Sequence, residues 1–346
     1  MSAEYPSEKC LLTMPDVVMN KVLGKLDFPA IQCLRKTCST LRTFIDAVKP
    51  DPALDRLQIY AKHDNISYMF DEHVVIKCCR NGEGCNVEWR ERDNRPHEKL
   101  LEFENFVDVT SKDIISVLTN QKSEMELLRV NAFRCPDDIL EEQQELLYQF
   151  SEQLLSNLES HLASKPKKLQ VETFEIQVAE MAQVLHLLPH LDVKNLKITN
   201  EKSDNYGAVL NMQELIELEQ WKKLDTLEIL NCFVNLRIED LLHLKRCYLH
   251  YETINSAMIE ELKEAFRTSS HLKSFRIGST QSDIQHLMDP RYAGPHIQFD
   301  QIVGDIETWF FSVSTPERVL VISIIDRQIV FESGWLVFVP EGATIN

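Results

Sequence analysis

The chain has 346 residues and a net charge of −17, with 44% apolar and 26% charged residues. This length predicts about two domains, and so acidic a surface argues against binding to the phosphate backbone of nucleic acids. Nine glycines in the whole chain also argue against glycine-rich phosphate-binding loops.

The N-terminus, the apolar stretches and the cysteine content indicate where in or outside the cell the protein is expected. Residues 1–8 are polar and include two acids, so no secretory signal is expected. The longest apolar stretches, such as residues 319–325, are far shorter than the roughly 20 residues of a membrane helix. Nine cysteines, an odd number, fit reduced thiols. We therefore expect an intracellular protein, in the cytoplasm or the nucleus, with no membrane attachment.

A short helical segment is predicted at residues 14–50, after an expected disordered leader at residues 1–13. Pro15 suits the first turn of a helix, where its missing N–H is no loss. A first apolar face then consists of Val18, Val22, Leu23 and Leu26. The run breaks at Asp27, which is expected to cap the helix that follows. The apolar face of this second helix consists of Ile31, Leu34, Cys38, Leu41 and Ile45. So few helices rarely form a self-sufficient core, so we expect the segment to pack against the rest of the chain or a partner.

This segment is also locally basic. Residues 9–50 contain seven lysines and arginines against three aspartates. One interpretation is an acidic partner for this segment, and the other is ordinary solvation of helix surfaces.

Residues 51–99 are predicted to form a β-rich linker segment. Short runs of β-branched and aromatic residues predict strands at 57–60, 66–70, 74–78 and 87–90. Residues 81–84, Asn-Gly-Glu-Gly, predict a turn. Residues 91–105 are charged and are expected to be a loop.

Strand-like and helix-like stretches alternate in residues 100–296. The predicted strands are 127–133, 171–177, 193–199, 226–230, 246–250 and 272–278, and the predicted helices are 137–163, 179–188, 212–222 and 256–269. Several strands share a Leu-x-x-Val or Leu-x-Ile pattern, which favours a leucine-rich-repeat-like curved strand–helix domain. The fold class is then α+β or α/β, with a small helical domain first. The alternative is an ordinary α/β domain without repeats.

Residues 297–346 are predicted to form a capping segment that shields the open end of the repeat-like domain. A helix is expected at 299–311, followed by strands at 319–325, 329–331 and 335–339.

Residues 14–46 resemble an F-box, and most of all its nematode form. The motif is carried by Met14-Pro15-Asp16, Leu26-Asp27-Phe28, Leu34-Arg35-Lys36, Leu41-Arg42 and Phe44-Ile45-Asp46. Met14 replaces a usual leucine, Val17 a common glutamate, and Thr37 a typical valine.

A second resemblance covers about residues 142–280, which look like the FTH domain of nematode F-box A proteins. It is carried by residues 187–192, 219–224, 238–243 and 269–275. The order of the two domains is itself part of the family pattern.

The resemblance implies a non-catalytic subunit of a ubiquitin ligase. Its F-box would bind a Skp-type adaptor and, through the adaptor, a cullin, while the FTH domain would hold an unknown protein substrate. The expected adaptor contacts are Pro15, Val18, Val22, Leu23, Leu26, Ile31, Leu34 and Leu41, with Arg35, Lys36 and Arg42 at the rim. Internal packing of the F-box is the alternative role for each apolar residue.

Catalytic and metal motifs are weak in this sequence, and no cofactor or metal is expected. Cys78, Cys79 and Cys85 lack a second ligand pair at zinc spacing, with His73 the nearest histidine. His186 and His190 lack the glutamate of a zinc-protease motif. Acid pairs such as Glu141-Glu142 and Glu260-Glu261 are expected to be solvated, and Trp221 to lie in the core.

Two further functions remain open besides the ligase subunit. One is an interaction scaffold that acts independently of a ligase, and the departures at Val17 and Thr37 leave room for it. The other is an enzyme with a concealed site, for which the sequence offers no recognisable catalytic motif.

Overall fold

The computed structural model describes residues 14–346 apart from 72–73, 91–94, 133–139, 201–207, 281–283, 285–287, 289–291, 293, 301–303 and 326. The expected leader and the predicted helix start at Asp137 lie outside the described residues. The chain divides into two compact units, residues 1–129 with 140–171, and residues 130–139 with 172–346.

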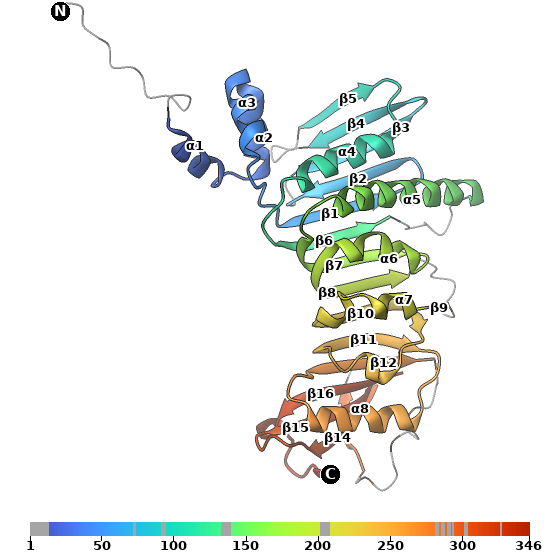
Figure 1. Cartoon of the computed structure of the whole chain (residues 1–346). Coiled ribbons are helices and arrows are strands. Elements are labelled where there is room, and N and C mark those ends of the chain that lie inside the picture. Colours follow the sequence, from blue (N-terminus) through green and yellow to red (C-terminus); the bar gives the residue numbers. More distant parts are fainter. Residues whose placement is uncertain are drawn as a thin grey trace, which may run out of the picture. The chain divides into compact units, whose positions relative to one another are not determined.

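The first unit begins with three helices, labelled in Figure 1: α1 (Asp16–Leu23), α2 (Phe28–Thr37) and α3 (Ser39–Val48). The Asp27 carboxylate caps α2 by accepting a hydrogen bond from the Ala30 N–H at 2.9 Å, as predicted for this break. The predicted second helix is not continuous. Cys38 adopts an extended backbone between α2 and α3, and its Sγ accepts from the Leu41 N–H.

An antiparallel sheet follows these helices. Its strands in chain order are β1 (Arg56–Ala61), β2 (Asn65–Phe70), β3 (Val74–Asn81), β4 (Gly84–Arg90) and β5 (Pro96–Leu101). Each strand pairs with the next, and β6 (Met125–Asn131) lies beyond β1. The first four strands were predicted, whereas β5 lies where a loop was expected. Charged residues suit β5 because it is an edge strand with an exposed surface.

Two helices cover this sheet. The helix α4 (Phe106–Leu118) contacts β2, β3, β4 and α5 (Glu141–Ala163). Its residues Phe106, Val107, Ile114, Val117 and Leu118 are buried. The sequence did not predict α4, because its start is rich in β-branched residues, which have low helix propensity. The Asn105 side chain caps it, accepting from the Val107 N–H at 2.8 Å.

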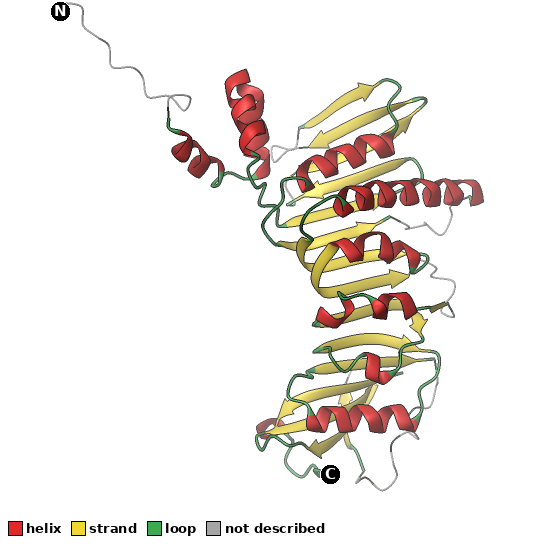
Figure 2. Ribbon diagram, viewed as in Figure 1, coloured by secondary structure: helices red, strands yellow, loops and turns green. Residues whose placement is uncertain are grey.

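The second unit begins with strands joined through short helices (Figure 2). Its first elements are β7 (Leu169–Val178), α6 (Ala182–Leu187), η2 (Leu188–His190), β8 (Leu191–Asn200), β9 (Val209–Leu210), α7 (Gln213–Glu217), η3 (Trp221–Lys223), β10 (Thr226–Val234), η4 (Ile238–Asp240), β11 (Arg246–Tyr251), α8 (Ser256–Thr268) and β12 (Ser274–Ser279). The strands β8, β10, β11 and β12 are adjacent and parallel.

The second unit ends in an antiparallel meander. Its elements are β13 (His296–Asp300), β14 (Gly304–Ser312), β15 (Arg318–Ile325), β16 (Gln328–Trp335) and η6 (Leu336–Phe338). Each strand pairs with the next, and β16 pairs antiparallel with β12. The helix predicted at residues 299–311 is therefore wrong. Trp309, Phe310 and Phe311 are all buried, and a strand buried on both faces lacks the alternation that distinguishes it from a helix.

The predicted leucine-rich-repeat-like curved strand–helix domain is also wrong. The described residues contain 16 strands of mixed sheet and eight α-helices. A repeat array requires parallel strands throughout. Here β8, β10, β11 and β12 pair parallel, whereas β1–β5 pair antiparallel with one another and β16, β15, β14 and β13 continue the sheet antiparallel from β12. The similar Leu-x-Ile strands are buried core strands, which share this pattern without belonging to repeats.

Candidate functional site

The three N-terminal helices form a small core of their own. Leu23, Ile31 and Ile45 are buried against one another, and Leu26, Leu34 and Phe44 pack around them. Each helix contributes to this cluster, so the helices depend on one another for burial.

The expected adaptor contacts divide according to exposure. The buried ones are Leu23, Ile31 and Leu41, the half-buried ones are Val22, Leu26, Leu34 and Arg35, and the exposed ones are Pro15, Val18, Lys36 and Arg42. Internal packing accounts for the buried set in this chain. Only the exposed and half-buried residues present atoms to a partner without rearrangement of the helices.

An exposed apolar patch lies at the start of α1. Its members Met14, Val17 and Val18 are 38%, 67% and 40% exposed. We call these three residues the α1 patch. Val17 was noted in the sequence only as a departure from a common glutamate. That departure was the sequence signal that could have identified Val17 as an exposed apolar residue of α1.

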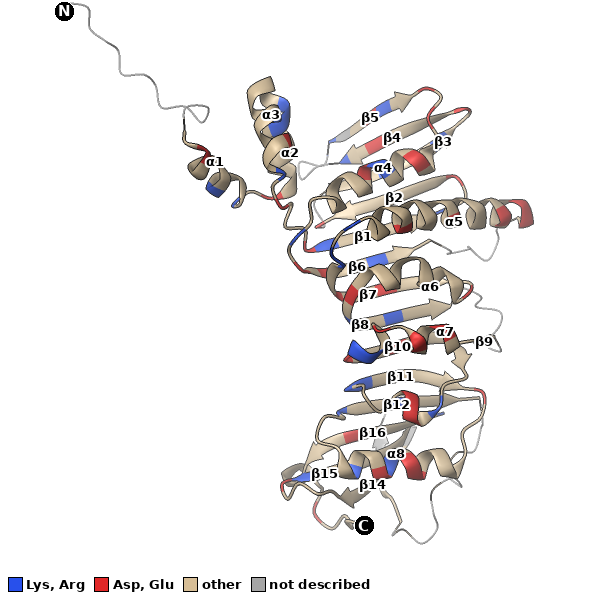
Figure 3. Ribbon diagram, viewed as in Figure 1, with Lys and Arg blue, Asp and Glu red and all other residues tan. Residues whose placement is uncertain are grey.

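The basic residues of this segment surround the helices (Figure 3). Figure 3 shows lysine and arginine positions along these helices. Lys21, Lys25, Lys36, Arg42 and Lys49 are exposed. Arg35 differs from them, because its Nε and Nη2 donate to the two carboxylate oxygens of Asp46 at 2.6 and 3.3 Å. This hydrogen bonding raises the pKa of Arg35 and lowers the pKa of Asp46. The pair joins α2 to α3, so Arg35 already has a partner within the F-box helices.

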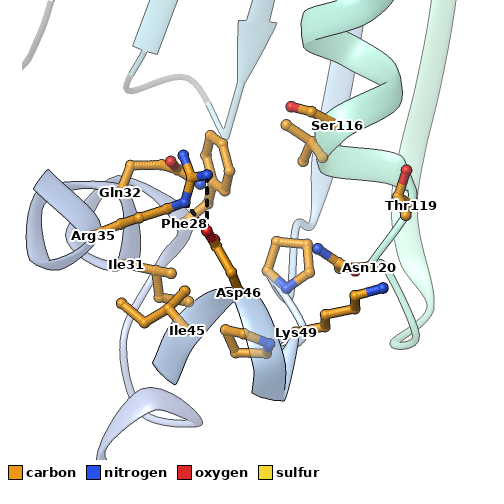
Figure 4. Close-up of a pocket in the computed structure, with 13 residues that line it drawn as sticks. Phe28, Ile31, Gln32, Arg35, Ile45, Asp46, Lys49, Ser116, Thr119 and Asn120 are labelled. Atoms are coloured by element: carbon orange, nitrogen blue, oxygen red, sulfur yellow. Dashed lines mark hydrogen bonds and ion pairs between the residues drawn. The ribbon is translucent and has the colours of Figure 1, made fainter. Parts of the chain in front are cut away.

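A cavity of about 340 Å³ opens beside this ion pair (Figure 4). The residues that line it are Phe28, Ile31, Gln32, Arg35, Ile45, Asp46, Lys49, Pro50, Pro52, Ser116, Val117, Thr119 and Asn120. One wall is thus built from α2 and α3 and the other from the end of α4. The surface is mixed polar and apolar, and it lies between the N-terminal helices and the end of α4.

The connector between α3 and β1, residues 49–54, is fixed by hydrogen bonds to the loop after α4. The Asp51 carboxylate accepts from the Lys122 N–H at 3.1 Å and from the Ser123 N–H at 2.8 Å. Gln121 and Leu54 exchange two hydrogen bonds: the Leu54 N–H donates to Gln121 Oε1, and Gln121 Nε2 donates to the Leu54 carbonyl. These bonds hold the connector in one conformation.

A second, more apolar cavity of about 470 Å³ lies between α2 and the sheet. Phe28, Phe70 and Trp89 contribute aromatic walls, and Lys36 and Asp113 are charged residues in the lining. The Tyr68 hydroxyl donates to Asp113 Oδ2 at 2.5 Å. Burial raises the pKa of Asp113, although the bond from Tyr68 and the charge of Lys36 act in the opposite direction.

The weaker sequence candidates do not assemble into a second site. Within the described part of the chain, no three His, Cys, Asp or Glu side chains lie close enough to hold a metal ion. Cys78 and Cys85 are buried free thiols, and His73 lies outside the described residues. The absence of metal and cofactor stays a prediction.

The helix with His186 ends at Leu187, and Pro189 places His190 in a separate turn. Trp221 is buried, and its Nε1 donates to the Asp240 carbonyl at 3.2 Å, so its predicted core position is confirmed. No helix among the residues described here is long and apolar enough to cross a membrane.

Comparisons with known families identify both predicted domains. A model of the F-box domain matches residues 11–52, and a model of the FTH domain matches residues 152–290. The predicted F-box and FTH architecture is therefore confirmed, and the nematode grouping stays a prediction. No curated protein and no solved structure matches the chain. The F-box domain indicates an adaptor role in a ubiquitin ligase, and proteins with this domain are typically non-catalytic.

Proposed function

We propose that this F-box and FTH protein is the substrate-recognition subunit of an SCF-type cullin-RING ubiquitin ligase. Its F-box binds a Skp-type adaptor, the adaptor binds a cullin, and the FTH-containing part of the chain holds a protein substrate. The observation that carries the proposal is an F-box match on helices that present the α1 patch to solvent.

The α1 patch supports adaptor binding on physical grounds. An amphipathic helix that lays apolar side chains into a groove is a common mode of recognition. Val17 and Val18 are adjacent on α1, and replacing their water contacts by apolar contacts releases free energy. Met14, two residues before the first residue of the helix, is also exposed and apolar.

Charge supports the same partner. Lys21, Lys25, Lys36 and Arg42 surround the F-box helices and are exposed, whereas the chain as a whole carries a net charge of −17. An acidic adaptor is attracted to this region and repelled by the remaining surface. Such complementarity increases the association rate and fixes the orientation of a complex.

The connector between α3 and β1 supports a role in positioning the substrate. A ligase subunit without catalytic groups acts by raising the effective concentration of a substrate lysine near the conjugating machinery. Flexible attachment of the F-box dilutes this effect, because the effective concentration falls with the volume that the tether explores. The hydrogen bonds of Asp51 and Gln121 attach the connector after the F-box to the loop after α4, and this supports a positioning role.

The second candidate function is an interaction scaffold that acts independently of a ligase and whose F-box binds the adaptor alone or has no binding role. Val17 and Thr37, the departures from the usual F-box pattern, favour this alternative. Both are exposed in the structure, so neither departure disrupts the F-box core.

One experiment distinguishes the two functions. The full chain is mixed with a purified Skp-type adaptor and a cullin, and the complexes are separated by size exclusion with light scattering. The ligase proposal predicts one complex that contains all three proteins. A complex of chain and adaptor that excludes the cullin contradicts the ligase proposal and favours the scaffold. Failure of the folded chain to bind the adaptor also contradicts the ligase proposal and leaves the scaffold.

A further inference from the structure

A run of four exposed apolar residues follows the last strand of the second unit. Trp335, Leu336, Val337 and Phe338 are 47%, 41%, 81% and 77% exposed. A contiguous exposed run that includes two aromatic residues is unfavourable in water, and such patches mark interaction sites in soluble proteins. We call residues 335–338 the C-terminal apolar run.

The run does not belong to the core of the meander. On the neighbouring strands Phe311, Leu320 and Phe331 are at most 3% exposed, so the core is complete without it. Phe331 also stacks on Phe266 of α8, with ring centroids 5.9 Å apart. Val337 and Phe338, which are 81% and 77% exposed, therefore lie largely outside this core.

Backbone hydrogen bonds hold the segment that carries the run at both ends. At its start the Leu336 N–H donates to the Glu317 carbonyl at 3.0 Å. At its end the Asn346 N–H donates to the Phe310 carbonyl at 2.8 Å, and the Ser312 N–H donates to the Asn346 carbonyl at 3.0 Å. The segment thus runs from the end of β16 past β15 to β14 (Figure 1).

Trp335 is oriented by a cation. The Arg318 guanidinium lies 4.4 Å from the centre of the Trp335 ring, and its Nη1 donates to Ser333 Oγ at 3.1 Å. A fixed aromatic side chain loses little conformational entropy on binding, and this favours tight association. Tryptophan is also enriched among the residues that dominate interface energies.

The charges around the run determine which partner fits. Residues 301–346 contain six acids and two bases, a net charge of −4. Of the two bases, Arg318 is stacked on Trp335. Glu317 and Glu341 are exposed and lie close in sequence to the Arg318–Trp335 pair and to Phe338. Glu317, whose carbonyl accepts from the Leu336 N–H, and Glu341 are thus the exposed acids next to the run, while the Arg318 cation is engaged by Trp335. A complementary partner is therefore apolar at its centre and carries basic residues that can meet these two carboxylates.

We propose that the C-terminal apolar run binds a segment of the target protein that has apolar side chains flanked by lysine or arginine. The inference rests on the proposed function for the identity of the partner as a ligase substrate. It goes beyond that function in placing a target contact on residues 335–338, outside the FTH match, which ends at residue 290.

The test selects binding peptides from a display library of random peptides of about 12 residues, with the full chain as bait. The proposal predicts that enriched peptides combine apolar residues with lysine or arginine. Val337→Asp/Phe338→Asp is expected to weaken their binding at least about tenfold, because the buried contacts become charged. The matched control Val75→Asp/Phe103→Asp, at positions in the first unit that are 41% and 80% exposed, is expected to leave binding unchanged.

A second variant keeps the test informative if the first variant misfolds. Glu317→Lys/Glu341→Lys changes only exposed charges and is expected to weaken the basic peptides by about tenfold at low salt. No enrichment, enrichment of acidic peptides, or full binding by both test variants would overturn the proposal. A dimer that dissociates in Val337→Asp/Phe338→Asp would also overturn it, because a second copy would then occupy the run.

Adaptor binding separates this inference from the proposed function. Val337→Asp/Phe338→Asp is expected to bind a Skp-type adaptor as tightly as the wild type. The reciprocal variant Val17→Asp/Val18→Asp is expected to retain peptide binding. Loss of peptide binding alone therefore concerns the C-terminal apolar run, and loss of adaptor binding alone concerns the F-box.

Discussion

Phe28 at the start of α2 packs edge-on against Phe70 at the end of β2, with ring centroids 5.3 Å apart and an interplanar angle of 61°. This aromatic pair joins the F-box helices to the first sheet. Phe70 also contacts Tyr68 edge-on, with ring centroids 5.6 Å apart. The F-box therefore packs against an aromatic cluster that belongs to the core of the sheet. Stability of the sheet and orientation of the F-box are therefore linked at Phe28.

Phe28→Ala is expected to loosen the F-box. Truncation removes the edge-on ring contact and leaves a void, and for a half-buried phenylalanine we expect a loss of about 2 kcal/mol. Hydrogen exchange measures the effect as reduced protection of α2 and α3, with β2 less affected. Phe103→Ala is the control, because Phe103 is 80% exposed. Equal protection in Phe28→Ala and wild type would show that the aromatic pair does not hold the F-box.

Asp51→Ala is expected to destabilise the connector. The carboxylate accepts hydrogen bonds from the N–H groups of Ala53, Lys122 and Ser123. Removing a charged acceptor of several N–H groups typically costs about 2 kcal/mol. Urea unfolding should show this loss, with a smaller loss for Asp51→Asn, which keeps one acceptor oxygen. Asp55→Ala, at a nearby exposed aspartate, provides the control, and an equal midpoint for Asp51→Ala and Asp55→Ala would refute the prediction.

Gly278 and His250 are expected to be coupled. They face each other on the paired strands β12 and β11, and a Cβ on Gly278 would lie 2.2 Å from His250 Nδ1. Gly278→Ala must displace the imidazole, and such overpacking costs about 1–3 kcal/mol. In a double-mutant cycle, His250→Ala should recover much of this loss. Gly294→Ala, which meets no atom within 4 Å, should cost nothing, and additive losses in the cycle would contradict the proposed clash.

The stability of the second unit is expected to decrease as the pH falls, because His243 is protonated more readily in the unfolded chain. Burial lowers the pKa of His243 below its usual value, although hydrogen bonds to the Trp221 and Asp240 carbonyls act in the opposite direction. The unfolded chain therefore binds the proton more readily. Stability is fully present above about pH 6.5 and is lost as the pH falls toward the lower folded pKa. Unfolding at about pH 7.5 and pH 5.5 should show a smaller decrease for His243→Gln than for wild type, and equal decreases would contradict the assignment.

Local patterns predicted much of this structure. The Asp27 cap, the strands β1–β4, and the strand at each Leu-x-Ile pattern of the second unit follow from residues close in sequence. The pairing of those strands, in contrast, could not be predicted from residues close in sequence. An apolar strand sequence fits a parallel repeat and a mixed sheet equally well, because a strand buried on both faces shows no alternation of apolar and polar residues. Direction is set by distant partners, such as β16 beside β12.

In the candidate site, too, some features follow from local sequence and others depend on contacts between helices. Helical spacing identified an apolar face on α1, but it did not separate Leu23, which is 1% exposed, from Val18, which is 40% exposed. That distinction depends on contacts with Ile31 and Ile45 from the next two helices. Likewise the charge of Arg35 suggested a rim contact, whereas its bond to Asp46 comes from the packing of α3 on α2.

Burial also decides which substitution tests the adaptor contact. An aspartate at Leu23 would place a charge in the F-box core and unfold the helices, so a loss of binding would carry no information about the interface. The α1 patch offers surface positions instead. Val75 and Val209 are suitable control positions, because they are exposed valines, at 41% and 50%, outside the F-box.

The most direct test of the account is the affinity of the full chain for a purified Skp-type adaptor, measured by titration calorimetry. We predict that wild type binds, that Val17→Asp/Val18→Asp weakens binding at least about 100-fold while remaining folded by circular dichroism, and that Val75→Asp/Val209→Asp binds as wild type does. Equal affinity of the wild type and the Val17→Asp/Val18→Asp variant, or no binding by folded wild type, would contradict the account.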